Sequence, residues 1–350
     1  MGCLLGKRVE KMKARRTRVY IKIEGKDITK TLEDYLTGFS YTDNEEEAAD
    51  DLQINLEDRA GHWLSDWLSK AGKGLKVEAK ILQEEAGKTR PLPCGIFEID
   101  NISSAGPPDK VTLKAISLPT SGSLSGEEKS RAWEKAKLSS IAGEIAKANK
   151  MGFFFDSSHD PRYDRKEQQK QTDIAFLQDL CKEAGINLKI TAQKIVMFDA
   201  SKYEKMKPVA TFTKGASDIF GYKFATNLKD TGYSSCEVSY TDSKTKKTIK
   251  GKFDNPDKGK VKKILKINTK VSSTQEANEL AKKNLREKNK KETTAGLEVL
   301  GNVKYVAGNT VKIKGWGLYD GKYIIETAGH SVGSGGYTTS LTLRKVLKGY

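Results

Sequence analysis

The sequence predicts an α+β protein that is mainly β, with two antiparallel β domains on either side of a small α+β domain in chain order. Three observations support this class. Several short segments alternate between apolar and polar residues, which is typical of half-buried strands. Helical spacing appears only in the middle of the chain and near residue 280. The 31 glycines supply many turns, and an apolar share of 37% is enough for a packed core.

Residues 17–119 are predicted to form the first β domain, preceded by a basic arm at 1–16. Its strands alternate over residues 19–24, 39–43, 51–57, 75–82, 95–102 and 110–115. The turn Gly106-Pro-Pro-Asp separates the last two, and a short helix carrying His62, Trp63 and Trp67 lies between strands. Five or six strands at this spacing indicate a closed or nearly closed β-barrel.

Residues 123–200 are predicted to form the α+β domain, after a polar linker at 121–126. Apolar residues recur at helical spacing from Trp133 to Asn149, followed by a strand at 151–155 and a polar loop at 156–165. A second helix spans 171–185, where Thr172 or Asp173 can cap its start and Gly185 can end it. A hairpin at 187–199 completes the domain.

Residues 201–350 are predicted to form the second β domain. Its strands lie at 211–213, 221–225, 235–240, 297–301, 309–314, 322–326 and 338–344. The Lys-rich stretch 242–262 is predicted to form an exposed hairpin tip. The capping box Ser273-Thr-Gln-Glu276 opens an inserted helix near 273–291.

The positive charge of the chain is concentrated in two segments. The formal net charge is +16, and residues 1–18 contribute +6 while residues 201–296 contribute +12. Such segments can bind nucleic acid, a membrane surface or an acidic protein partner. A solvated Lys-rich face is the favoured interpretation, because Lys outnumbers Arg and few aromatic residues are interleaved with the lysines.

Several classes of protein are not indicated by the sequence. The apolar runs are far shorter than the roughly 20 residues of a membrane helix, and the N-terminus has no apolar region of signal-peptide length. The four cysteines show no CxxC spacing and have no histidine near them in sequence, so neither a zinc site nor a disulfide framework is predicted. A reduced, cytoplasmic origin is the expectation.

Three residues were weighed as catalytic candidates. Cys181 lies on the apolar stripe of a helix, where a cysteine usually packs as a small core residue. His159 precedes Asp160 in a polar loop, but sequence neighbours seldom form a catalytic triad. His330 follows a strand and is interpreted as a turn histidine that bonds the backbone.

Two motifs were weighed as ligand sites. The acids between Asp43 and Asp58 lack the order of a calcium-binding loop and read as solvated charges. The segment 317–323 resembles a phosphate loop only superficially, since its spacing is wrong and a strand follows. No catalytic, cofactor-binding or metal-binding residue is predicted, which favours a structural or binding protein over an enzyme.

The sequence resembles the phage late control gene D family, the hub proteins of contractile tails, tailocins and related injection machines. The resemblance covers nearly the whole chain and is carried by the order of three segments. The first is Arg131-Ala-Trp133 with residues 141–149, and the second is Tyr163 to Gly185 with the hairpin ending at Asp199. The third comprises Ala307 to Ile313, Asp320 to Ser331 and Gly336 to Leu341.

The resemblance implies a homotrimer in which each chain carries two related β-barrel domains. Three chains then give a pseudo-sixfold ring that adapts a sixfold tail tube to a threefold spike. The implied partners are further copies of the chain, the tail tube, spike and baseplate wedge proteins, and the tape-measure protein, with no membrane and no specific nucleic acid. The implied location is the host bacterial cytoplasm, followed by assembly into a virion or tailocin baseplate.

In this interpretation His330 and Asp173 are scaffold residues, a turn contact and a helix cap. The basic segments would face acidic neighbours or the ring lumen, which charge reversal of Lys246, Lys247 and Lys250 would test. Two alternatives stay open from the sequence. One is a tail-associated peptidoglycan hydrolase, which would clear cell-wall material in a zymogram. The other is a basic nucleic-acid-binding protein, whose binding would weaken steeply with salt.

Overall fold

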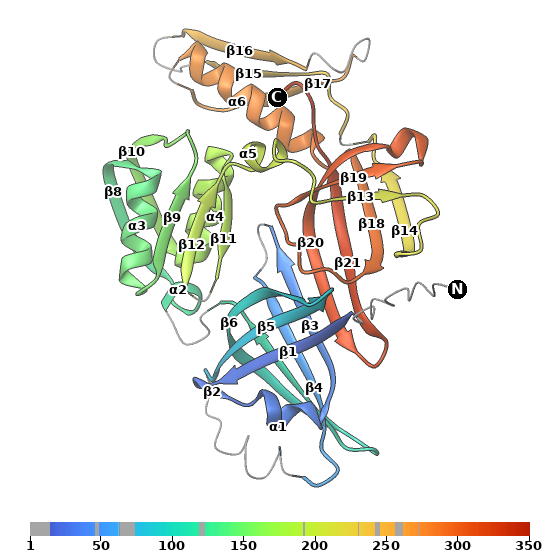
Figure 1. Ribbon diagram of the computed structural model, residues 1–350. Helices are drawn as coiled ribbons and strands as arrows, with labels where there is room; N and C mark the ends of the chain where they lie inside the picture. The colour runs from blue at the N-terminus through green and yellow to red at the C-terminus, as the bar shows by residue number, and fades with distance from the viewer. Residues whose placement is uncertain are drawn as a thin grey trace, which may run out of the picture.

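The computed structural model describes residues 15–45, 49–61, 63, 74–118, 123–191, 193–229, 231–241, 246–255, 262–271 and 273–350. The chain is mainly β within the α+β class, as predicted (Figure 1). Residues 1–14 of the predicted basic arm at 1–16, and most of the helix predicted around Trp67, lie outside these ranges, although Trp63 itself is buried.

The first β unit comprises six strands whose alternation matches the sequence prediction. They are β1 (Arg16–Ile23), β3 (Leu36–Asn44), β4 (Asp51–Glu57), β5 (Lys76–Glu85), β6 (Lys88–Ala105) and β7 (Lys110–Ile116). A short strand β2 (Lys26–Asp27) and helix α1 (Thr29–Glu33) follow β1. Every second residue of β4 is buried, because one face of the sheet covers the core and the other meets water.

The second β unit also comprises six strands. They are β13 (Ala210–Thr213), β14 (Ile219–Thr226), β18 (Thr293–Leu300), β19 (Thr310–Lys314), β20 (Gly321–Gly333) and β21 (Gly336–Lys345). A 3₁₀ turn, η3 (Gly317–Tyr319), precedes β20. Phe212, Val311 and Tyr323 are among its fully buried core residues.

The two β units have the same strand order. In space the first runs β3-β4-β7-β6-β5-β1 and the second runs β14-β18-β21-β20-β19-β13. With the two-residue strand β2 left aside, numbering each unit's strands by their rank in the chain gives the order 2-3-6-5-4-1 in both cases. Four of the five pairings in each unit are antiparallel and equivalent, whereas the last is antiparallel for β1 with β5 and parallel for β13 with β19.

The two units also interrupt their strands at matching places. The second strand of each shifts register just before a glycine, and the fifth strand of each shifts register just after an isoleucine. In the second strands, the shifts lie between Leu36 and Gly38 of β3 and between Ile219 and Gly221 of β14. In the fifth strands, they lie between Ile99 and Asn101 of β6 and between Ile325 and Thr327 of β20. Because a β-bulge bends and re-aims a strand, matching bulges indicate that the units share their curvature as well as their topology.

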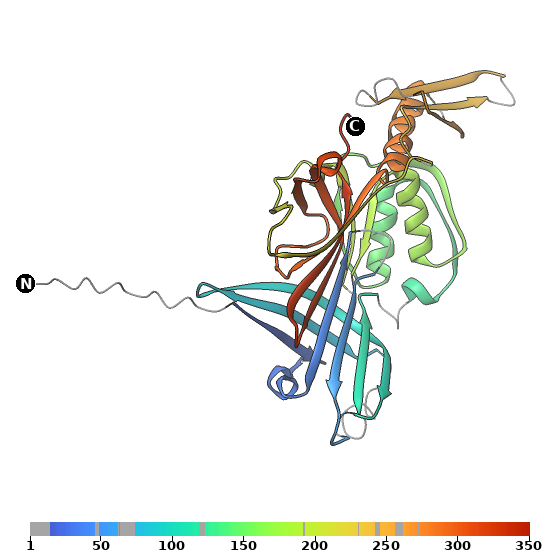
Figure 2. The ribbon, with the colours of Figure 1, turned by 90° about the vertical axis from the view of Figure 1, so that its right-hand side faces the viewer.

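The β units lie side by side although the α+β unit separates them in the chain. Strand β20 pairs with β3, so the two units form one continuous sheet, and the α+β unit lies to one side of it (Figures 1 and 2). The predicted closed barrel is not observed: among the described residues the pairings follow an open path from β14 to β2, with β19 and β13 as a branch from β20.

The α+β unit differs from its prediction at two places. Trp133 lies in strand β8 (Lys129–Lys137) rather than in a helix, and residues expected in a loop form part of strand β10 (Arg162–Gln171), which pairs with β8. Both strands carry so many charged residues that little alternation is visible in the sequence. The indole of Trp133 nevertheless reaches the core, where its ring stacks on Phe176 at 5.2 Å.

The remaining elements of this unit match the prediction more closely. They are α2 (Ser123–Gly126), α3 (Leu138–Ala148), β9 (Gly152–Asp156), α4 (Asp173–Ala184), β11 (Asn187–Ile190) and β12 (Lys194–Phe198), followed by α5 (Ala200–Glu204). The predicted linker at 121–126 partly forms α2, whose Leu124 is fully buried. The N-cap of α4 is Thr172 and its end is the left-handed Gly185.

A separate insertion unit interrupts the second β unit between β14 and β18. It contains β15 (Ser235–Thr241), β16 (Thr248–Asp254), β17 (Ile264–Asn268) and α6 (Thr274–Asn289). The prediction placed 235–240 in the second β sheet and 242–262 at a hairpin tip. Instead β15 pairs with β16 and β17 in a sheet of its own, which packs against α6 through Val238, Ala277 and Leu285.

Replacing Gly251 of β16 with valine should loosen the insertion unit. A Cβ atom there would lie 2.5 Å from both the Ala277 Cβ and the Asn278 backbone nitrogen, so α6 must move away. We expect a loss of about 1–3 kcal/mol, the usual cost of overpacking. Limited proteolysis within α6 measures it, with the exposed Lys250→Val as control. Equal cleavage of the two variants would contradict the prediction.

Candidate assembly surfaces

The residues weighed for catalysis do not converge. Cys181 is buried in the core of the α+β unit, where burial raises the pKa of its thiol to about 12. Cys94 and Cys236 are also buried free thiols. His159 lies in a loop in which its backbone N–H donates to the Ser157 hydroxyl. The part of the chain that the structure describes has no cluster of three or more His, Cys, Asp or Glu residues able to hold a metal ion.

Asp173 is not the helix cap that was predicted. Its fully buried carboxylate accepts hydrogen bonds from Lys129 at 2.7 Å and from Asn149 and Gln168 at 3.0 Å each, and it also pairs with Arg131. Burial opposes ionisation, but these donors hold the pKa of Asp173 below its ordinary value. The residue therefore ties β8 and β10 to α4.

The acidic residues around Asp43 are not simply solvated charges. Asp43 and Asp50 are buried, and both contact the ammonium group of Lys189 from β11, with Asp50 at 3.3 Å. Burial raises the pKa of Asp50 to about 6 although Lys189 counteracts the shift. Asp43 also accepts a hydrogen bond from the Ala307 backbone N–H at 2.8 Å. This cluster joins the α+β unit and the second β unit to the first.

A second buried ion cluster surrounds Arg344 of β21. The side chain of Arg344 is 1% exposed and lies between the carboxylates of Glu45, Glu204 and Glu326. Glu204 also accepts a hydrogen bond from Arg286 of α6 at 2.7 Å. One guanidinium thus contacts acids from the end of β3, from α5 and from β20, and no local sequence pattern predicts this cluster.

His330 lies at the junction of the two β units rather than in a turn. It is fully buried in β20, opposite Tyr41 of β3, and the two rings stack at 5.9 Å. Its Nε2 donates to the Tyr305 carbonyl at 2.9 Å, which leaves Nδ1 to accept from the Tyr337 hydroxyl at 2.8 Å. Burial lowers the pKa of His330 to about 4, so the imidazole is neutral.

The junction between β20 and β3 is antiparallel and extends over seven residue pairs, from Thr327 with Asn44 to Gly333 with Gly38. Phe39, Tyr41, Ala328 and His330 have at most 4% of their surface exposed. The fifth strand of the second unit therefore covers the second strand of the first unit.

The equivalent edges at the other side of each unit have no such cover. After Glu98, where its pairing with β5 ends, β6 pairs only with β7 among the described residues, so its other edge is free. The edge of β14 that faces away from β18 is also free in the described part of the chain. Apolar side chains are exposed along both edges: Ile102 at 38%, Phe220 at 57% and Tyr222 at 54%. An uncovered strand edge with apolar side chains is a pairing site.

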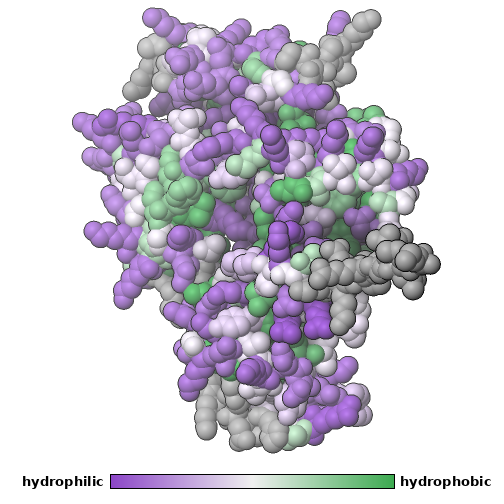
Figure 3. All heavy atoms as spheres, viewed as in Figure 1, coloured by the Kyte–Doolittle hydropathy of each residue, from purple (hydrophilic) through white to green (hydrophobic). Residues whose placement is uncertain are grey.

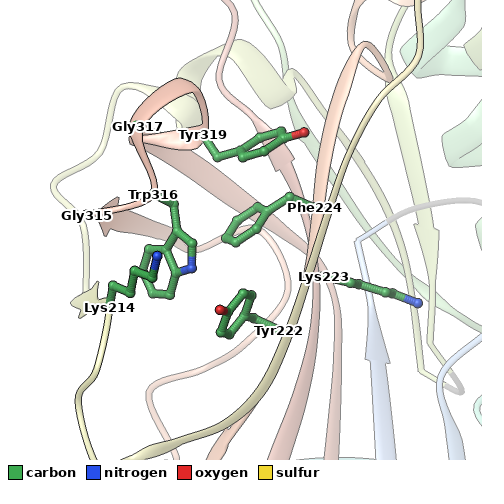
Figure 4. Close-up of a pocket in the computed structure, with 8 residues that line it drawn as sticks. All are labelled: Lys214, Tyr222, Lys223, Phe224, Gly315, Trp316, Gly317 and Tyr319. Carbon is green, nitrogen blue, oxygen red and sulfur yellow. The ribbon is translucent and has the colours of Figure 1, made fainter.

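An aromatic hollow adjoins the free edge of β14 (Figure 4). It has a volume of about 720 Å³ and is lined by Tyr222, Phe224, Trp316 and Tyr319 together with Lys214 and Lys223. Phe224 stacks on Tyr319 at 4.8 Å, and Trp316 meets Tyr222 edge-on at 5.3 Å. Hydrophilic side chains cover most of the face in Figure 3, interrupted by hydrophobic groups over the second β unit and the α+β unit.

No helix in the described part of the chain is both long and apolar enough to span a bilayer.

Comparison with known sequences identifies relatives of one kind. A family model described as YQBQ-like matches residues 182–344. The chain is 27% identical over 252 residues to the probable baseplate hub protein of Escherichia phage 186, and 26% identical over 223 residues to that of Escherichia phage P2. The matches cover 69% and 61% of this chain but only 58% and 54% of the relatives, so the chain spans less than two thirds of their length.

Solved structures share the fold at low sequence identity. The tail protein from Neisseria meningitidis MC58 matches with a TM-score of 0.69 and 13% identity over 94% of this chain and 97% of that one. The E. coli c3393 protein, a component of the type VI secretion system described as similar to the T4 tail proteins gp27 and gp5, matches with a TM-score of 0.58 and 12% identity. That match covers 94% of this chain and 78% of the other.

The solved structures share their fold with this chain over nearly its whole length. The chain is similar in sequence to baseplate hub proteins of phages, which confirms the resemblance predicted from its sequence.

Proposed function

We propose that this protein is a structural hub of a contractile phage tail or a phage-tail-like particle, in which three copies form a ring of six β units. The ring adapts a sixfold tail tube to a threefold spike. The observation that carries this proposal is the duplicated β unit, with one strand order and matching bulges in both copies. A partner that contacts only the shared strands meets six similar surfaces, whereas a partner that contacts the α+β unit meets three.

The junction between β20 and β3 supports a closed ring. It joins one edge of the second unit to a different edge of the first, and such heterologous contacts generate rings when the rotation closes. Each unit is an open sheet in the single chain, so we propose that the predicted barrel wall is completed only when neighbouring copies supply the missing edges. This arrangement would also hide the free edges of β6 and β14.

The proposed partners follow from the same role. They are two further copies of the chain, a tail tube protein, a spike protein and baseplate wedge proteins, with the tape-measure protein as a further neighbour. Assembly would take place in the host bacterial cytoplasm, and the protein would end in the virion or tailocin baseplate. No chemical step is assigned to the chain, because its candidate nucleophile Cys181 is buried with a raised pKa.

The mass of the purified protein tests the proposal. We expect the mass of three chains in native mass spectrometry, either for the protein alone or after mixing with the tube and spike proteins of the same particle. The complex with the tube and spike should contain three copies of the chain. A single-chain mass in every mixture, or a complex with two or six copies, would refute the ring.

A further inference from the structure

We propose that the end of β6 in one copy pairs antiparallel with β14 of the next copy, in the register that places Ser103 opposite Ala225. The inference rests on the proposed ring and specifies its contact between copies. Its template is the junction between β20 and β3 inside the chain, which joins the same two positions of the repeated β unit.

The fifth strands β6 and β20 can be aligned residue by residue. Ile99 and Ile325 each immediately precede the bulge, and each donates its backbone N–H at 2.9 Å to the residue just before the fourth strand of its unit, to Leu75 and Asn309 respectively. Both bulges carry an acid, Asp100 and Glu326. Counting onward from the isoleucines, Ser103 is the equivalent of Gly329.

The second strands β3 and β14 can be aligned in the same way. Gly38 and Gly221 each follow the bulge and pair with the third strand of their unit. Counting onward from these glycines, Tyr222 is the equivalent of Phe39, Phe224 of Tyr41 and Ala225 of Thr42. Gly329 lies opposite Thr42 in the chain, and the equivalent pair is therefore Ser103 and Ala225.

Burial shows what the proposed contact would cover. In the internal junction Phe39 is 1% and Ala328 is 0% exposed, whereas their equivalents Tyr222 and Ile102 are 54% and 38% exposed. Ile102 is apolar like Ala328, and Tyr222 and Phe224 are aromatic like Phe39 and Tyr41. The free edges thus expose the same kind of surface that the internal junction buries, which indicates a second copy of this chain as the occupant.

The register also accounts for the aromatic hollow beside β14. Continuing the register by three residue pairs places Gly106 opposite Tyr222. The turn Gly106–Asp109 of the neighbouring copy then lies against the hollow. This turn contains Pro107 and Pro108, which have no backbone N–H to leave unpaired and present apolar rings to aromatic side chains. An apolar turn from the neighbour would therefore fill a hollow lined by Tyr222 and Trp316.

Oxidative crosslinking of a Ser103→Cys/Ala225→Cys variant tests the register. Paired strands place opposite Cα atoms about 4.5–5.5 Å apart, within the range of a disulfide. The experiment uses the full chain with Cys3→Ser, since the three other cysteines are buried. We expect covalent species of two and three chains on a non-reducing gel.

Two variants serve as controls. Ser103→Cys with Lys223→Cys moves one thiol by two residues, about 7 Å along the strand, and should crosslink at least tenfold less. The Ser331→Cys/Ser40→Cys variant places two thiols at an opposite pair of the internal junction. Its two introduced thiols should form a disulfide within one chain, so the protein should not gain mass on a non-reducing gel.

The outcomes separate the register from the ring. Equal crosslinking of both intermolecular variants would overturn the proposed pairing. So would the absence of crosslinks in Ser103→Cys/Ala225→Cys under conditions in which the protein has the mass of three chains. If the unoxidised protein still has the mass of three chains, the hub proposal survives that result and only the register fails. If every mixture with tube and spike contains single chains, both fail.

Discussion

Replacing Arg344 with methionine should lower the free energy of unfolding by about 3–5 kcal/mol, the range seen when one partner of a buried ion pair is removed. Arg344 is 1% exposed and contacts Glu45, Glu204 and Glu326. Methionine fills much of the same volume but leaves these carboxylates without their shared cation. The shift in the urea midpoint, with its slope, measures the loss.

Two further variants separate the charge effect from packing. Lys312→Met removes an exposed cation from β19 and should change the stability by less than about 0.5 kcal/mol. Adding Glu204→Gln to Arg344→Met removes one of the buried negative charges, so the double variant should recover part of the loss. A cost for Arg344→Met no larger than that of Lys312→Met would show that the cluster contributes little.

The stability of the junction between the β units should fall as the pH is lowered from 7 to 4, and His330 should account for about 3 kcal/mol of the fall. Burial lowers the pKa of His330 to about 4, against an ordinary value of 6.5. Between these values the unfolded chain binds a proton that the folded chain does not. The contribution is fully present above pH 6.5 and is lost as the pH falls toward 4.

His330→Gln is the matched variant, because its amide can still donate to the Tyr305 carbonyl but does not titrate. We expect it to be less stable than the parent at pH 7 and closer to the parent at pH 4.5, by urea unfolding at each pH. Asp50 acts in the opposite sense, since its raised pKa of about 6 favours the folded state at low pH, but it is present in both proteins. Parallel pH curves for the two proteins would rule out His330 as the cause.

Local pattern was enough to predict most strands of both β units. Residues such as those of Asp51–Glu57 alternate strictly, since one face of each strand packs on a core and the other meets solvent. The helix cap at Ser273 was predicted and Thr172 was one of two candidates for the other cap, because a side-chain hydroxyl that accepts an N–H in the first turn has a local signature.

Pairings between distant strands could not be predicted in this way. The edge of β3 is covered by β20, almost 290 residues later, and nothing in either strand alone identifies its partner. The charged ribbon of β8 and β10 was missed for a related reason: its residues are mostly exposed, so no apolar periodicity appears. Arg344 and Lys189 look like ordinary surface cations until the fold surrounds them with carboxylates.

One signal in the sequence could have identified the assembly surfaces. Leu36-Thr-Gly-Phe-Ser-Tyr41 and Ile219-Phe-Gly-Tyr-Lys-Phe224 share an aliphatic residue, a glycine two positions later and two aromatic residues at the same spacing. An internal repeat of this kind indicates a duplicated structural unit.

The covalent link between the two β units makes assembly of the proposed ring less dependent on protein concentration. In a ring of six units, three of the six strand junctions lie within single chains and form at an effective concentration set by tethering, independent of how much protein the cell makes. Only the other three respond to dilution. A ring of unlinked units would need six junctions between separate molecules where the fused chain needs three, which lowers the entropic cost of closing the circle.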